Sequence, residues 1–350
     1  MTTSEQLSDT DKRLLDLIQT GVPIVQRPFA RLGEQLGLSE TEVVERILSL
    51  KHGRIIRQIS AIFDTRSIGY ASSLVAVRCD PACEEAAASV ISTHPGVSHN
   101  YKRNHDFNIW FTIAVPPNSR FGLEKTVDIL QRLSGAQSMR LLPTLRLYKI
   151  GVQLDIEGGA EPATKSMAAF TATDQKASVA VTPDEIAFIR EMQRDLPVEP
   201  EPFARACAAL RMSCAGLAAM AAEMRAQGKM RRFSAVLNHR QAGFAANAMG
   251  IWPVDPARPD LDAIGEKMAS FRAVSHCYRR PTYPDWPYSI FTMVHGRTHD
   301  ECEAVLAEIS RETGVTGYRA LYSTHEWKKN RVVYFDSAIE KWEAVYAGEA

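Results

Sequence analysis

The string Val-Ser-His-Asn-Tyr-Lys-Arg at positions 97–103 returns as Val-Ser-His-Cys-Tyr-Arg-Arg at positions 274–280. Successive side chains of a β-strand point to opposite faces, so a strand here would carry its histidine, tyrosine and final arginine on one face. The predicted rows are His99, Tyr101 and Arg103 in the first half and His276, Tyr278 and Arg280 in the second. Alternation would turn Ser98, Asn100 and Lys102 to the opposite face. A row of imidazole, phenol and guanidinium is poor core material, and it predicts a pocket for an anionic ligand, with or without a metal.

Three further pairs of similar segments occur in the same order in the two halves, which indicates that the whole half is duplicated. They are Pro28-Phe29-Ala30-Arg31 with Pro202-Phe203-Ala204-Arg205, Ile59-Ser60-Ala61 with Phe233-Ser234-Ala235, and Phe111-Thr112 with Phe291-Thr292. Between the halves, residues 157–180 are rich in Gly, Ala, Thr and Ser without periodicity. Such a composition predicts a flexible linker.

Each half begins with three helical patterns and an extended stretch, which is typical of a winged helix-turn-helix. In the first half Ser39 and Glu42 form a predicted capping box for the third helix. A β-α-β-β-α-β order follows, which is that of a ferredoxin-like module, with its last strand expected at 138–150. The predicted domains are winged helix-turn-helices at 8–66 and 181–240, ferredoxin-like modules at 67–156 and 241–335, and a C-terminal helix at 336–350. The fold class is therefore α+β, in two tandem copies, and we expect the two ferredoxin-like sheets to associate as an intramolecular pseudo-dimer.

Composition excludes several classes of partner. The chain has 41 basic and 41 acidic residues, so no net field favours nucleic acid or an anionic membrane. No apolar run approaches the ~18 residues that a membrane span needs, and the N-terminus lacks the apolar core of a signal peptide. We therefore expect a cytoplasmic protein. The six cysteines lack the paired spacing of a zinc site.

A winged helix followed by a βαββαβ module resembles the Lrp/AsnC family of regulators. DNA readers of this kind present Arg, Lys, Asn or Gln to base edges. The first candidate recognition helix, 39–50, offers Glu40, Glu42, Glu45 and one arginine, Arg46, and the second, 213–226, is mostly Ala and Met. We therefore predict that the protein does not bind DNA sequence-specifically.

Two longer segments resemble the sirohaem decarboxylases, a branch of the same superfamily that works as two related subunits. The segment SHNYKRNHDFNIWFT at 98–112 is similar to one subunit, and AVSHCYRRPTYPDWPYSIFTMVHG at 273–296 to the other. The resemblance covers nearly the whole chain and implies that the two subunits are fused. It implies removal of carbon dioxide from the acetate groups at positions 12 and 18 of sirohaem, giving 12,18-didecarboxysirohaem in haem d1 biosynthesis.

The same resemblance implies a lyase that needs no redox cofactor and no cofactor beyond its iron tetrapyrrole substrate. Its partners would be sirohaem and, as candidates, other enzymes of the haem d1 pathway. Two alternatives remain open at this point: a ligand-responsive transcriptional regulator and a non-catalytic tetrapyrrole carrier.

Decarboxylation of a pyrrole acetate leaves an electron pair on a methylene carbon, and the product methyl group needs a proton. His99 and His276 are candidates for the proton donor or for a ligand of the substrate iron, and no other metal site is expected. Arg103 and Arg280 are candidate carboxylate clamps, and Tyr101 and Tyr278 could orient a carboxylate or the imidazole. Further candidates for substrate binding are Lys102, His105, Arg279, Trp286 and, on the wings, Arg57 and Arg232.

Overall fold

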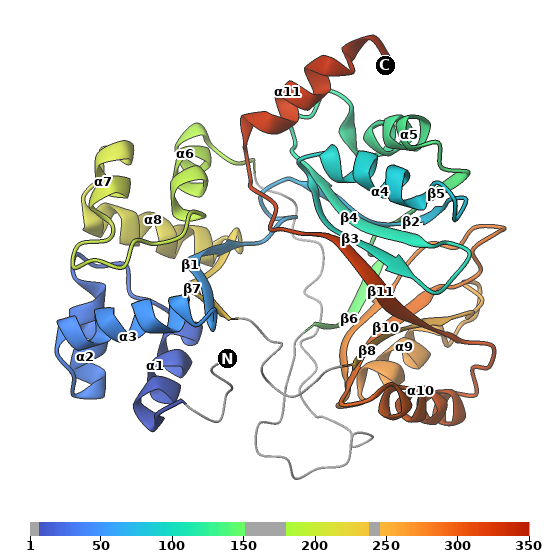
Figure 1. The fold of residues 1–350 in the computed structure, drawn as a ribbon, viewed down its shortest axis with the longest axis horizontal. Coiled ribbons are helices and arrows are strands. Elements are labelled where there is room, and N and C mark those ends of the chain that lie inside the picture. Colours follow the sequence, from blue (N-terminus) through green and yellow to red (C-terminus); the bar gives the residue numbers. More distant parts are fainter. Residues whose placement is uncertain (1–6, 151–179, 238–245, 350) are drawn as a thin grey trace. The chain divides into compact units, whose positions relative to one another are not determined.

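The computed structural model describes residues 7–150, 180–237 and 246–349, and these form two compact units. One unit comprises Met1–Tyr70, Ala177–Gln241 and Val333–Ser337, and the other comprises Ala71–Lys176, Ala242–Val332 and Ala338–Ala350. Both halves of the chain therefore contribute to each unit: the helix-turn-helix modules form one and the ferredoxin-like modules form the other (Figure 1). Apart from Ala180, the predicted linker at 157–180 lies outside the described residues.

The helix-turn-helix unit contains the two predicted sets of three helices. They are α1 (Asp9–Thr20), α2 (Pro28–Leu36) and α3 (Glu40–His52), then α6 (Pro183–Met192), α7 (Ala204–Leu210) and α8 (Cys214–Ala226). Their first turns explain where they begin, because side chains satisfy amide groups that have no partner within the helix. Ser39 and Glu42 form the predicted capping box, and Thr182 and Glu185 form its counterpart at α6.

Each half of the chain contributes a single strand as its wing, and the two strands pair with each other. Strand β1 (Ile56–Phe63) pairs antiparallel with β7 (Met230–Leu237), with Ile59 opposite Ala235. Burial of both residues gives the pair an apolar side. The buried ammonium of Lys229, just before β7, is compensated by Glu185, whose carboxylate lies 2.7 Å away.

The other unit holds one nine-stranded sheet among the residues that are described, covered by helices of both halves (Figure 1). Its strands are β2 (Ala71–Arg78), β3 (Val97–Arg103), β4 (Ile109–Val115), β5 (Ser138–Leu142), β6 (Arg146–Ile150), β8 (Ala246–Trp252), β9 (Val274–Arg279), β10 (Ile290–Gly296) and β11 (Arg319–Lys329). Its helices are α4 (Glu84–Thr93), α5 (Gly122–Ser134), α9 (Leu261–Ala269), α10 (His299–Thr313) and α11 (Ser337–Val345). The strand order is β5-β2-β4-β3-β11-β8-β10-β9-β6.

This order corrects the prediction of one strand at 138–150. The segment forms two strands, of which β5 pairs with β2 in its own half and β6 pairs with β9 in the other half. Pro143 lies in the gap between them, and proline cannot donate to a β-ladder. In return β11 pairs with β8 and continues along β3. The exchange of β6 and β11 joins the two modules into the predicted pseudo-dimer.

Three apolar clusters hold this unit together. Two lie between the sheet and the helices, one in each half. The third lies on the opposite sheet face and draws on both halves, from Phe107 and Trp110 to Trp286, Phe291 and Leu321. The two modules therefore bury against each other a sheet face that neither could cover alone.

The C-terminal helix α11 is docked by a few specific contacts. Trp342 packs edge-on against His94, with ring centroids 4.5 Å apart, and buried Glu343 accepts a hydrogen bond from the Arg120 amide at 3.1 Å. Ile339 is buried, whereas Val345 at the end of the helix is 74% exposed. Among the described residues, no single helix has the length and apolarity to cross a membrane, although the bent pair Ala204–Leu210 and Cys214–Ala226 passes that test together.

Candidate functional site

The two predicted rows of side chains form, one on β3 and one on β9. The rings of His99 and Tyr101 lie side by side with centroids 5.9 Å apart, and those of His276 and Tyr278 do the same at 6.0 Å. Both rows lie on the sheet face opposite the helices, because Asn100, between the first two rings, donates instead to the Ala88 carbonyl of α4. The duplicated sequence has therefore produced a duplicated geometry.

The two serines do not lie where alternation placed them. The ladder between β3 and β4 shifts register between Val97 and His99, and that between β10 and β9 shifts at the equivalent point. Such a bulge opposes two residues to one and breaks the alternation of faces. Ser98 and Ser275 consequently lie on the same side as the histidines that follow them, and the prediction that Ser98 faces away was wrong.

Each serine hydroxyl contacts the Nδ1 atom of its histidine. The distance is 3.0 Å from Ser98 Oγ to His99 and 2.7 Å from Ser275 Oγ to His276. The second contact of each hydroxyl differs, since Ser98 meets Thr112 Oγ1 at 2.7 Å and Ser275 meets His295 Nε2 at 2.6 Å. Burial lowers the pKa of His276 to about 4, so this imidazole is neutral at pH 7.

These serine contacts escaped the sequence analysis. The repeated Val-Ser-His triplet was the available signal, because the serine is shared by both strings and had no assigned role. The one-residue offset between the halves was missed as well. Phe111 and Phe291 were matched, yet Trp110 lies opposite Tyr101 and Phe291 lies opposite Tyr278, so Trp110 is the counterpart of Phe291.

Arg103 is a buried cation without an acidic partner. One of its terminal nitrogens donates to the Leu321 carbonyl at 3.0 Å, and its Nε has no hydrogen-bond partner. Among the described residues no carboxylate pairs with it. Burial lowers the pKa of Arg103 to about 10, which still leaves the group charged at pH 7. A buried charge left in this way is unfavourable until an anion compensates it.

Arg280 ends the second row in a different environment. Its guanidinium lies over the rings of Tyr278 and Phe291, at 4.9 and 5.4 Å from their centroids. It also donates to the carbonyl of Leu142, in the first half of the chain. The two row-ending arginines therefore both reach backbone carbonyls of the other half.

Two of the predicted substrate-binding cations lie on the helix side of the sheet. Lys102 forms an ion pair with Glu84 of α4. Arg279 pairs with Asp262 of α9 at 3.2 Å. Each cation is therefore compensated on the face opposite the rows, and the role of Lys102 and Arg279 in substrate binding stays a prediction.

Trp286 is a core residue rather than an exposed stacking surface. It is fully buried and meets the rings of His105, Phe107 and Trp110 at 5.2–5.3 Å. His105 is half-buried and accepts the Phe107 amide proton at Nδ1, 3.0 Å away. The segment PTYPDWP at 281–287 of the second half thus packs against the first half, and Asp285 anchors it by a bidentate ion pair with Arg140 at 2.9 and 3.0 Å.

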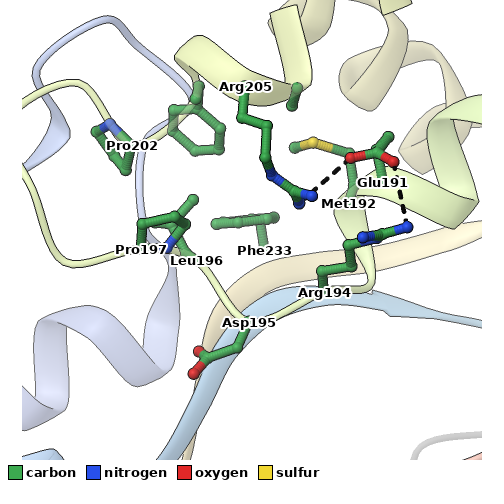
Figure 2. Close-up of a pocket in the computed structure, with 11 residues that line it drawn as sticks. Glu191, Met192, Arg194, Asp195, Leu196, Pro197, Pro202, Arg205 and Phe233 are labelled. Atoms are coloured by element: carbon green, nitrogen blue, oxygen red, sulfur yellow. Dashed lines mark ion pairs between the residues drawn. The ribbon is translucent and has the colours of Figure 1, made fainter. Parts of the chain in front are cut away.

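Arg57 and Arg232 are exposed residues of β1 and β7 in the helix-turn-helix unit, and their role in substrate binding stays a prediction. The same unit has a shallow pocket of about 270 Å³ beside α6 and α7 (Figure 2). Arg194 and Arg205 reach into it but both pair with Glu191, at 3.5 and 3.3 Å. With its charges compensated and a volume below the usual ligand range, this pocket is a poor candidate for an anionic tetrapyrrole.

In the part of the chain that the structure describes, no group of three or more His, Cys, Asp or Glu side chains is arranged to hold a metal ion. The iron-ligand role of His99 or His276 stays a prediction.

Comparison with known proteins identifies both kinds of module. A model of the AsnC-like ligand binding domain matches residues 67–149 and 241–328, and a model of the siroheme decarboxylase NirDL-like HTH domain matches residues 11–57. A siroheme decarboxylase of Hydrogenobacter thermophilus is 37% identical over 94% of this chain and 96% of its own length. The siroheme decarboxylase alpha subunit of Desulfovibrio desulfuricans is 38% identical but covers 43% of this chain and 86% of its own length.

Two solved structures agree with this match over almost the full length. The crystal structure of the siroheme decarboxylase NirDL is 32% identical, covers 98% of this chain and 100% of its own, and superposes with a TM-score of 0.77. The crystal structure of its complex with an iron-uroporphyrin III analogue is 31% identical, covers 97% of this chain and 99% of its own, and superposes with a TM-score of 0.76. This identity extends across both halves of the chain, which carry the duplicated rows and the exchanged strands. The chain therefore belongs to the siroheme decarboxylase family.

Proposed function

We propose that this protein is a sirohaem decarboxylase that removes carbon dioxide from the acetate groups at positions 12 and 18, giving 12,18-didecarboxysirohaem. The observation that carries the proposal is the buried, uncompensated guanidinium of Arg103 at the end of a row with His99 and Tyr101. A substrate with eight carboxylates supplies the missing anion. The iron-uroporphyrin III analogue in the similar crystal structure is a ligand of the same class.

Each residue of a row has a distinct task in this proposal. Arg103 and Arg280 hold carboxylates, since a guanidinium fork matches a carboxylate in shape and charge. The tyrosines orient a carboxylate or the imidazole. The histidines donate a proton or bind the iron of the substrate.

The reaction needs no external electrons. The bond between the methylene carbon and the carboxylate breaks, carbon dioxide leaves, and the macrocycle accommodates the electron pair. One proton then converts the methylene to a methyl group, so each step consumes one proton and releases one carbon dioxide. We therefore propose a carbon-carbon lyase that uses no redox cofactor.

Anaerobic incubation of the pure protein with sirohaem tests the proposal. We expect products lighter by one and then two carbon dioxide units in the mass spectrum, with heat-denatured protein as the control. Binding that changes the visible spectrum without any loss of mass would instead identify a carrier. A sequence-dependent affinity for DNA would instead identify a regulator. We do not expect this result, because the exposed face of α8 carries Ala215, Ala219 and Ala222, whose side chains offer no hydrogen bonds to bases.

A further inference from the structure

Arg78, at the end of β2, adds a second guanidinium to the sheet face that carries the first row. Side chains of β2 alternate, because Val75 and Val77 belong to the helix-side cluster and Ala76 belongs to the cluster on the opposite face. Arg78 follows Val77 and therefore points to the row side. Its guanidinium confirms this placement, since its central carbon lies 4.7 Å from the ring centroid of Phe107, a member of the row-side cluster.

Arg78 and Arg103 lie at the same level of the sheet, with β4 between them. Ala76 is opposite Trp110 on β4, and Trp110 is opposite Tyr101 on β3. Arg78 and Arg103 each follow two residues later, and their backbones are two strand spacings apart, about 10 Å. The guanidinium of Arg103 also lies over an aromatic ring, 6.0 Å from the centroid of Trp110. The first half therefore has two guanidiniums at one level, each beside a buried aromatic side chain.

Among the described residues, no acidic side chain forms an ion pair with Arg78, and its Nε is buried without a hydrogen-bond partner. The pKa of Asp285 is lowered by its hydrogen bonds with Arg140 and, to a smaller extent, by the charge of Arg78. Both oxygens of Asp285 are engaged by Arg140, at 2.9 and 3.0 Å. Arg78 therefore resembles Arg103 in having no anion bound to it.

The second half has no counterpart of this cation. Arg78 lies two residues beyond the position opposite Trp110, and Pro253 lies two residues beyond the position opposite Phe291. An Asp-Pro dipeptide follows each of them after one intervening residue, which supports the same alignment. Proline stands where the first half has arginine, so the two sites differ in charge at this position.

We propose that Arg78 is a specificity-determining residue of the first site and binds a second carboxylate of the tetrapyrrole, beside the one that Arg103 holds. A uroporphyrin-type macrocycle carries carboxylates around its whole rim, so two cations on neighbouring parts of one sheet face can bind two of them together. The inference rests on the proposed function for its ligand. It makes the first site selective for a carboxylate that the second site does not recognise in this way.

The position of Arg78 suits a carboxylate that is held rather than cleaved. Arg78 is level with Arg103, which lies four residues beyond His99, and it is displaced by two further strands. It is therefore farther from the candidate proton donor than Arg103 is. A contact made there is equally strong in the ground state and in the transition state, so its loss raises KM and leaves kcat unchanged.

Titration of the full-length protein with iron-uroporphyrin III, followed by visible absorbance, tests the contact. Arg78→Gln should raise Kd about tenfold, as expected for the loss of one charge-assisted hydrogen bond from a partly buried residue. If both rows bind, one of the two binding steps should weaken and the other should not. Arg258→Gln is the matched control, because it removes the same charge from a guanidinium that is paired with Asp260 at 2.7 Å. Wild-type affinity in Arg78→Gln would overturn the proposal.

Ionic strength and a second variant separate a carboxylate contact from a structural role. Salt screens charges, so a higher NaCl concentration should narrow the difference in Kd between the wild type and Arg78→Gln. Arg78→Lys keeps the charge without the planar fork and should recover part of the affinity. A loss of affinity that is the same at every salt concentration, or that Arg78→Lys does not reduce, would show that Arg78 only supports the packing of Phe107.

Steady-state kinetics with sirohaem keep this inference apart from the proposed function. We expect Arg78→Gln to raise KM about tenfold and to leave kcat unchanged. A wild-type protein that binds iron-uroporphyrin III through Arg78 but releases no carbon dioxide from sirohaem would disprove the proposed function and leave the inference intact. Decarboxylation by Arg78→Gln with the KM of the wild type would support the function and overturn the inference.

Discussion

At the scale of single residues, the burial of Arg103 determines what the first row can bind. The residue is 9% exposed and stays charged at neutral pH, and a carbonyl group is the only hydrogen-bond partner of its side chain among the described residues. Arg279 is the informative contrast, because it has the same chemistry but is already paired with Asp262 on the other face. The environment therefore distinguishes a carboxylate clamp from a structural cation.

Replacing Arg103 with methionine should weaken the binding of an iron tetrapyrrole. Loss of one charge-assisted contact costs about 1.5–3 kcal/mol, or roughly 10- to 100-fold in Kd. Stability should hold or rise, because an uncompensated buried charge is removed. Titration of the visible absorbance measures Kd, with Arg279→Met as the matched control that should leave it unchanged. Equal effects of the two substitutions would contradict the clamp.

Replacing His99 with alanine should slow decarboxylation by roughly 10²–10⁴-fold, as expected for loss of a general acid. Single-turnover rates on each acetate, followed by mass spectrometry, measure the effect. His325→Ala is the control, because His325 is an exposed histidine of the neighbouring strand β11. Wild-type rates on both acetates in His99→Ala would show that the proton comes from elsewhere.

At the scale of secondary structure, the helices and most strands were predictable because their signals are local. Capping serines, first-turn prolines and apolar periodicity all act within a few residues. The bulges at Ser98 and Ser275 and the break at Pro143 were not predictable in the same way, because strand pairing sets the register. A shift of one residue turns a side chain to the other face, which is why Phe111 and Phe291 were matched wrongly.

Helix α11 belongs to this scale too, and His94 makes its docking sensitive to pH. Burial lowers the pKa of His94 to about 3, its Nδ1 accepts from the Gly96 amide at 3.0 Å, and Trp342 covers the ring. The unfolded chain binds this proton near pH 6.5, so it holds more protons than the folded protein between about 3 and 6.5. The stability that neutral His94 provides is therefore complete above pH 6.5 and is lost as the pH falls through this window.

We expect His94 to contribute about 2 kcal/mol of destabilisation between pH 7 and pH 5. Urea unfolding at the two pH values measures this, and His94→Asn is the comparison because an amide oxygen can still accept from Gly96. The wild type should lose more stability than the variant on acidification. An identical loss would mean that His94 is already solvated or protonated in the folded protein.

At the scale of the whole molecule, strand exchange makes the halves interdependent in the unit that carries the rows. Strand β6 completes the second module and β11 completes the first, while β1 and β7 need each other in the helix-turn-helix unit. Sequence periodicity identifies strands but does not identify partners that lie more than a hundred residues away. The intramolecular pseudo-dimer was predictable from the duplication, whereas its exchanged edges were not.

Dividing the chain within residues 157–176 should give two fragments that fold only together. Each fragment alone would leave a strand edge and an apolar sheet face uncovered, which favours aggregation. Co-expression should yield a one-to-one complex that elutes like the intact chain in size-exclusion chromatography. Two fragments that are each monomeric and folded would contradict the exchange.

The exchanged strands also bear on how the two halves can evolve. Glu326 and Lys329 of β11 lie opposite Tyr101 and His99, and Leu147 and Ile150 of β6 lie opposite Tyr278 and His276. The border of each site is thus encoded in the other half of the gene. A substitution in β6 or β11 therefore changes the site that lies in the other half. Neither half can diverge, or be replaced by that of a relative, without altering the site of its neighbour.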